Sequence, residues 1–195
     1  MGIRRVLVLA LLAATLTATP AVSEEETEVS PLPDGWKKAK FGMSTEEVLA
    51  AHPEAALERD EPELLLQTYI LSSPAPGIGR VTFFFFKDRL FKVALNFDLN
   101  EVEQRFQMRL FEKKYGPCQE KNLDWRPTEN ASKMVWVNDR HMIQLGQLVT
   151  TPGGPKAQAN HYLAAIYSDV KMATEYEEYA KNAAPKKHTL GWEDF

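Results

Sequence analysis

Four consecutive phenylalanines, Phe83 to Phe86, constrain the fold of this chain more than any other feature of its sequence. They end a run of strand-forming residues that begins at Val81, which predicts a β-strand. Successive side chains of a strand point to opposite faces, so Phe83 and Phe85 share one face and Phe84 and Phe86 the other. We therefore expect a central strand that is covered on both faces. Helices would cover one face, and the leader, a loop or the C-terminal helix would cover the other.

The alternative is that one pair of these rings stays uncovered as an interaction surface, because contiguous exposed apolar surface usually marks a binding site. On this hypothesis the candidate binding residues are Phe84 and Phe86, with Trp136 from a later strand. A flat aromatic patch would favour a protein partner, whereas a pocket lined by these three residues would favour an apolar small molecule.

Two further aromatic residues, Trp192 and Phe195, stand in the polar segment 184–195 at the C-terminus. Large aromatic side chains are unusual in a solvated tail. We expect the tail either to pack back on the domain or to act as a short docking peptide, and we include both residues among the candidate binding residues.

Alternation of apolar and polar residues, and helix-capping patterns, divide the chain into elements. Ser44 and Glu47 form a capping box at the start of the first helix, and Lys87-Asp88 is a two-residue hairpin connection. The predicted helices span 44–52, 100–115 and 173–182, and the predicted strands span 64–71, 81–86, 89–97, 133–137, 141–149 and 161–167. In the third of these strands, Phe91, Val93, Leu95 and Phe97 are expected to share one face.

The second predicted helix carries an apolar stripe. Val102, Phe106 and Leu110 recur at four-residue spacing, with Phe111 and Tyr115 beside them. This spacing predicts that the stripe packs against the sheet.

The order helix, three strands, helix, three strands, helix predicts an α+β fold. No helix separates the strands within a half, so we expect an antiparallel sheet of about six strands, built from two helix-plus-three-strand halves with a C-terminal helix.

The N-terminal residues have the pattern of a signal peptide. Arg4 and Arg5 precede the apolar run Val6 to Leu16, and Ala21-Val22-Ser23 fits the small-x-small cleavage rule, so the cut falls before Glu24. The apolar run is shorter than the ~20 residues that a transmembrane helix needs. We expect a periplasmic or secreted protein without a transmembrane segment after cleavage. No cysteine lies near the cut to carry a lipid anchor.

The predicted organisation is a signal peptide at 1–23, a disordered acidic leader at 24–34, one α+β domain at 35–183 and a tail at 184–195. The chain has a net charge of −4, and removal of the signal peptide takes away two arginines and no acidic residue. Without a lysine- or arginine-rich block, this acidic chain is a poor candidate for binding nucleic acid.

The sequence shows no convincing catalytic or metal-binding motif. The histidines His52, His141, His161 and His188 do not have the spacing of metal ligands, although His141 and His161 start predicted strands that could be neighbours. Nucleophile-elbow, P-loop and dinucleotide-binding patterns are missing. We therefore predict no catalytic residue, no metal site and no cofactor. The single cysteine, Cys118, permits no internal disulfide. We interpret it as half-buried and structural, the alternative being a bond to another chain.

Two short motifs carry a resemblance. Phe41-Gly42-Met43-Ser44-x-x-x-Val48 and Lys114-Tyr115-Gly116-Pro117 resemble segments of small exported bacterial modules of the SmpA/OmlA type, outer-membrane assembly lipoproteins whose folds are related to the β-lactamase inhibitor protein. The resemblance implies a module that binds proteins or scaffolds assemblies rather than catalysing reactions. Since this chain lacks their lipid-bearing cysteine, their tethering to the membrane is not carried over.

The sequence thus favours an exported non-catalytic binding or scaffold protein of the bacterial cell envelope, with another envelope protein as its partner. A carrier or sensor of an apolar small molecule is the alternative, and a hydrolase is a third hypothesis.

Overall fold

The computed structural model describes residues 29–98, 104–122, 133–150 and 160–183. The predicted signal peptide, the first half of the predicted leader, the predicted start of the second helix at Asn100 and the tail 184–195 lie outside these ranges.

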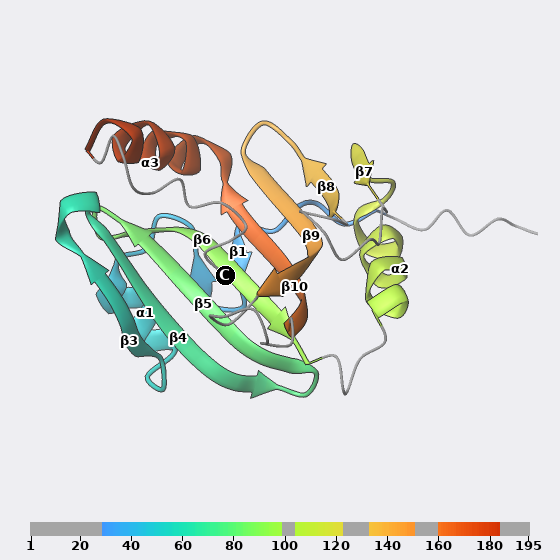
Figure 1. Cartoon of the computed structure of the whole chain (residues 1–195), viewed down its shortest axis with the longest axis horizontal. Coiled ribbons are helices and arrows are strands. Elements are labelled where there is room, and N and C mark those ends of the chain that lie inside the picture. Colours follow the sequence, from blue (N-terminus) through green and yellow to red (C-terminus); the bar gives the residue numbers. More distant parts are fainter. Residues whose placement is uncertain (1–28, 99–103, 123–132, 151–159, 184–195) are drawn as a thin grey trace, which may run out of the picture.

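One large antiparallel sheet dominates the described part of the chain (Figure 1), and the α+β prediction is confirmed. Its eight described strands, in sheet order, are β3 (Ala56–Glu61), β4 (Leu66–Ala75), β5 (Ile78–Phe86), β6 (Arg89–Phe97), β10 (Asn160–Asp169), β9 (His141–Thr150), β8 (Lys133–Val137) and β7 (Glu120–Asn122). The other elements are the hairpin of β1 (Gly35–Trp36) and β2 (Ala39–Lys40), the helices α1 (Thr45–Ala51), α2 (Gln104–Tyr115) and α3 (Val170–Ala183), and the short 3-10 helix η1 (Pro62–Leu64).

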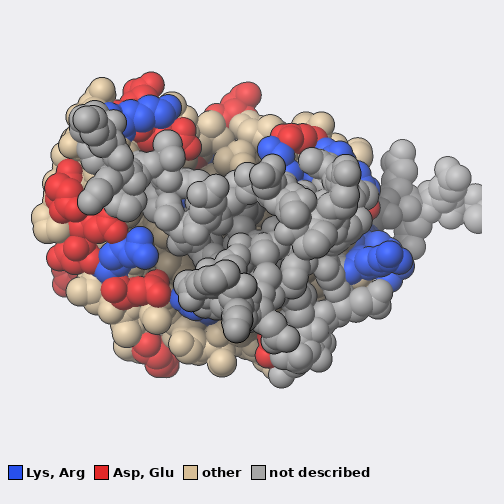
Figure 2. All heavy atoms as spheres, in the orientation of Figure 1, with Lys and Arg blue, Asp and Glu red and all other residues tan. Residues whose placement is uncertain are grey.

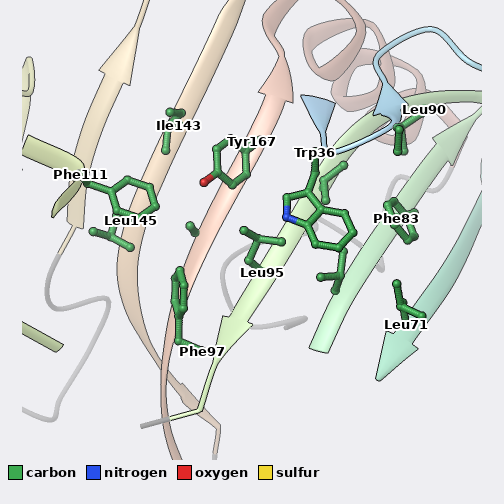
Figure 3. Close-up of a cluster of buried hydrophobic side chains, with 14 of the residues drawn as sticks. Trp36, Leu71, Phe83, Leu90, Leu95, Phe97, Phe111, Ile143, Leu145 and Tyr167 are labelled. Atoms are coloured by element: carbon green, nitrogen blue, oxygen red, sulfur yellow. The ribbon is translucent and has the colours of Figure 1, made fainter. Parts of the chain in front are cut away.

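Both faces of the sheet are covered, so the prediction from the four phenylalanines is confirmed. Phe83 and Phe85 belong to a cluster under the β1–β2 hairpin, α1 and α2, which we call the α1/α2 face. Figure 3 shows part of this cluster, which extends from Leu71 on β4 to Ile143 on β9. Phe84 and Phe86 belong to a second cluster under α3 and η1, which we call the α3 face.

The hairpin between β5 and β6 forms as predicted. Lys87 and Asp88 both have positive φ, 52° and 58°, as a two-residue type I′ turn requires. A bulge follows in β6, because Phe84 pairs with Lys92 while Phe85 pairs with Leu90. The extra residue, Phe91, therefore lies on the α3 face. Our prediction that Phe91 shares a face with Val93 was wrong for this reason.

The number of strands was underestimated. Two strands of the sheet, β3 and β7, were missed, and each half of the chain is a helix followed by four strands rather than three. β3 has the sequence ALERDE and lies at one edge with most of its side chains exposed. No apolar alternation marks a strand that buries neither face, and charged residues on an edge strand discourage pairing with other chains. β7 lies at the other edge and has only three residues.

The last residues of the predicted leader contact the domain. The Ser30 N–H donates a hydrogen bond of 2.8 Å to the Lys114 carbonyl at the end of α2. Leu32 packs against the core of the α1/α2 face, and Asp34 forms an ion pair with Lys40 at 2.6 Å. Ordered contacts therefore begin before residue 35, where the domain was predicted to start.

Candidate functional site

The predicted binding residues on β5 lie in the core. Phe84 is 5% exposed and Phe86 is 2% exposed. The ring of Phe86 meets the ring of Tyr176 on α3 with 5.4 Å between centroids, and the ammonium groups of Lys92 and Lys87 lie 4.7 Å from the ring centres of Phe84 and Phe86, respectively. A partner would reach the ring of Phe86 only if α3 moved away.

Trp136 lies on the opposite face of the sheet, among Phe111, Tyr115 and other residues of the α1/α2 face. It is 1% exposed. Its indole N–H donates a hydrogen bond of 2.8 Å to the carbonyl of Gly116. Phe84, Phe86 and Trp136 therefore do not line one pocket. The other two candidates, Trp192 and Phe195, lie outside the described residues.

The described histidines do not form a common site, and His188 lies outside the described residues. His141 pairs with Asp169, whereas His161 pairs with Val149 at the far end of the same two strands. Within the described ranges, no three His, Cys, Asp or Glu side chains come close enough together to hold a metal ion. Cys118 is half-buried against the core of the α1/α2 face, as predicted.

His52 has the most unusual environment of these histidines. Its ring stacks between Trp36 and Phe83, with 5.4 Å to each ring centroid. Its Nε2 atom is buried and has no hydrogen-bond partner among the described groups. Burial lowers the pKa of His52, and the positive charge of Lys37 lowers it further. A neutral imidazole in this position fits a structural role.

Large exposed apolar side chains on the described surface include a pair on α2, the helix whose orientation was predicted incorrectly. Phe106 is 49% exposed and Leu110 is 41% exposed, although the sequence pattern placed both against the sheet. The helix instead buries Phe111 and Tyr115, which pack against Trp136.

Phe111 and Tyr115 determine the orientation of α2, because they contact aromatic residues on strands of the sheet. The Trp136 hydrogen bond holds the residue that follows the helix. Tyr115 is hydrogen-bonded to Tyr167 on β10; burial, and to a lesser extent Tyr115, raise the pKa of Tyr167. These contacts commit one side of α2 to the core and leave the other side to solvent.

Basic side chains surround the exposed apolar pair. At 3.6 residues per turn, Lys113 falls on the same side of the helix as Phe106 and Leu110. Arg105 and Arg109 flank this side along one edge, and Lys114 flanks it along the other. All four basic residues are exposed. We call this surface the outer face of α2, comprising Arg105, Phe106, Arg109, Leu110, Lys113 and Lys114.

The single acidic residue of α2, Glu112, does not neutralise the outer face. Its carboxylate forms an ion pair of 2.6 Å with Lys121 on β7. It lies towards the edge of the sheet, on a half-buried part of the helix. The outer face is therefore a small apolar patch within a positively charged surface.

Acidic residues gather at the other end of the molecule. Residues 54–63, which include β3, contain five acidic residues and one basic residue. Figure 2 shows most of its red acidic side chains at the left, where Figure 1 places β3 and β4, with some blue basic side chains among them, and a blue patch at the right, over α2. The basic outer face thus lies far from the acidic end of the sheet.

A family model, described as the TP0088 domain, matches residues 34–179. The chain belongs to the TP0088 domain family. The match begins at the β1–β2 hairpin, includes all of the sheet and ends within α3. No curated protein and no solved structure matches the chain.

The outer face of α2 lies inside the matched residues of the TP0088 domain. The family description names no activity. As far as residues 29–183 are described, none of the helices combines the length and apolar character needed to cross a bilayer.

The outer face was not predicted from the sequence, because the stripe of Phe106 and Leu110 was expected to pack against the sheet. Two apolar stripes are present on α2, and the spacing of Phe106 and Leu110 is as regular as that of Phe111 and Tyr115. The signal that distinguishes them is their flanks. Arg105 and Arg109 lie beside Phe106, where a core-facing stripe would need apolar neighbours.

Proposed function

We propose that the mature chain is an exported, non-catalytic binding module of the bacterial cell envelope that binds another envelope protein through the outer face of α2. The observation that supports this most directly is the exposure of Phe106 and Leu110 at the centre of that face. Export itself rests on the signal-peptide pattern of residues 1–23.

Phe106 and Leu110 leave much of their apolar surface in contact with water in the free protein. Complete burial of a Phe or Leu side chain contributes ~1.5–3 kcal/mol, and about half of that remains available on each of these half-exposed residues. An aromatic residue encircled by charged side chains is the usual composition of an interaction hot spot with its polar rim. The fold does not need these two side chains, because Phe111 and Tyr115 supply the contacts of α2 with the sheet.

The test is a double substitution, Phe106→Ser with Leu110→Ser, compared with Leu57→Ser and Leu65→Ser. The control pair also consists of exposed apolar side chains, at the opposite end of the sheet. Chemical cross-linking in intact cells, followed by immunoblotting of the mature chain, measures complexes with other proteins.

We expect the α2 variant to keep its melting temperature and lose most of the cross-linked complex, while the control retains it. A variant that folds and still forms every complex of the parent would exclude the outer face of α2 as the binding surface.

A further inference from the structure

The basic residues of the outer face carry more information than the apolar pair alone. Arg105, Arg109 and Lys113 take part in no ion pair within the described part of the chain, whereas Lys40, Arg80, Lys87 and Lys121 each pair with a carboxylate. Together with Lys114, these three cations make the outer face of α2 strongly positive, although the chain as a whole has a net charge of −4. Their like charges repel one another in the free protein, and an anionic partner would remove this repulsion.

The position of the cations also matters, because they lie on both edges of the apolar pair. Arg105 and Arg109 lie along one edge and Lys114 along the other, with Lys113 between Phe106 and the C-terminal end of α2. A partner that seats an apolar side chain on Phe106 and Leu110 therefore brings its neighbouring groups within reach of cations on either side. Arginine is well suited to carboxylates, since its planar guanidinium donates two parallel hydrogen bonds to one carboxylate.

A lipid bilayer would offer anionic groups too, but α2 is poorly built to lie on one. A helix at the membrane interface buries a broad apolar face ~5–10 Å into the lipid. The broad apolar face of α2, with Phe111 and Tyr115, is already used in the core. Only two half-exposed side chains remain. The mature chain is also acidic as a whole, so a uniformly anionic membrane repels it. A short acidic segment bound to α2 lies within one Debye length, about 10 Å, of the basic residues there, so their attraction is only partly screened by salt.

We propose that the segment which binds the outer face of α2 is an acidic stretch of the partner protein, with one or two apolar side chains that contact Phe106 and Leu110. This rests on the proposed function, because it names the chemistry of the partner at the same surface. Carboxylates on either side of the apolar contact pair with Arg105 and Arg109 along one edge and with Lys114 along the other.

Photo-cross-linking in intact cells tests the composition of the bound segment directly. The full chain carries p-benzoylphenylalanine in place of Phe106, and mass spectrometry identifies the peptide that is attached to it. We expect a peptide with a clear excess of Asp and Glu over Lys and Arg. The same probe in place of Leu57 is the control for non-specific attachment, since that side chain is 53% exposed and Phe106 is 49% exposed.

Charge reversal gives a second, independent measurement. Arg105→Glu with Arg109→Glu is compared with Lys171→Glu and Lys181→Glu, exposed lysines of α3 that provide the same change in net charge. We expect the α2 reversal to lower the yield of chemical cross-linking in intact cells roughly ten-fold, because attraction at the rim becomes repulsion. The α3 reversal leaves the yield within about two-fold of the parent.

The outcomes separate the two proposals. A photo-cross-linked peptide without an acidic excess overturns the acidic segment and retains the protein partner. The same follows if the α2 reversal leaves the yield of chemical cross-linking unchanged while Phe106→Ser with Leu110→Ser abolishes it. Attachment to lipid alone, together with flotation of the purified mature chain on phosphatidylglycerol vesicles but not on phosphatidylcholine vesicles, overturns both. The absence of any adduct specific to position 106 also overturns both.

Discussion

His52 shows how a single residue couples the β1–β2 hairpin to the sheet. It is the C-terminal cap of α1, and its ring fills the space between Trp36 on the hairpin and Phe83 on β5. The charged groups that act on it are Lys37 and Lys38 of the hairpin and Glu54 after α1. Burial and the two lysines outweigh Glu54, so the pKa of His52 lies below its ordinary value.

This lowered pKa predicts that acid destabilises the fold. Below the unfolded-state pKa of about 6.5, the unfolded chain binds a proton that folded His52 does not bind, so stability is lost as the pH falls through and below this value. His52→Gln has no such proton to bind. Urea denaturation at pH 7.5 and pH 5 should therefore show a smaller loss of unfolding free energy in the variant than in the parent. An equal loss in both proteins would mean that other groups carry the pH dependence.

At the scale of the elements, α2 is the informative case, because its docking decides what is surface and what is core. The sequence predicted the ends of most elements well, since caps and turns are local. Ser44 and Glu47 form the predicted capping box of α1, and Gly116 ends α2 with a positive φ of 76°. Which of two apolar stripes a helix buries depends on its partners in space, and here Trp136 and Tyr167 select Phe111 and Tyr115.

Two alanine substitutions on α2 test this orientation. Phe111→Ala should lower the free energy of unfolding by about 3–5 kcal/mol, because it leaves a cavity beside Trp136. Phe106→Ala removes the same ring from the solvent side and should cost less than ~1 kcal/mol. Denaturant titration of both variants measures the difference. Equal losses, or a larger loss for Phe106→Ala, would contradict the orientation of the helix.

At the scale of the whole molecule, the sequence predicted the two halves of the sheet but gave each half three strands instead of four. Each half is a helix followed by four strands, and the two sets meet where β6 pairs with β10. Residues Phe97 to Lys92 pair there with Leu163 to Ser168. The central strands are recognisable in the sequence by their apolar residues. The edge strands β3 and β7 bury few side chains, so their sequences show no comparable pattern. The outer face of α2 escaped sequence reasoning for a related reason, since exposure is a property of the packed molecule.

The β6–β10 junction predicts that the halves unfold together. Ala164 and Ala165 are completely buried at this junction. The hydrophobic cluster on the α1/α2 face extends across the junction, because it includes Phe83 on β5 and Leu145 on β9. Separating the halves would expose this buried surface and break the backbone hydrogen bonds between β6 and β10. We therefore expect that neither half stays folded without the other. Native-state hydrogen exchange should give the same free energy of opening for the amides of Phe83 and Leu145. Values that differ by more than about 1 kcal/mol would show that each half of the sheet opens on its own.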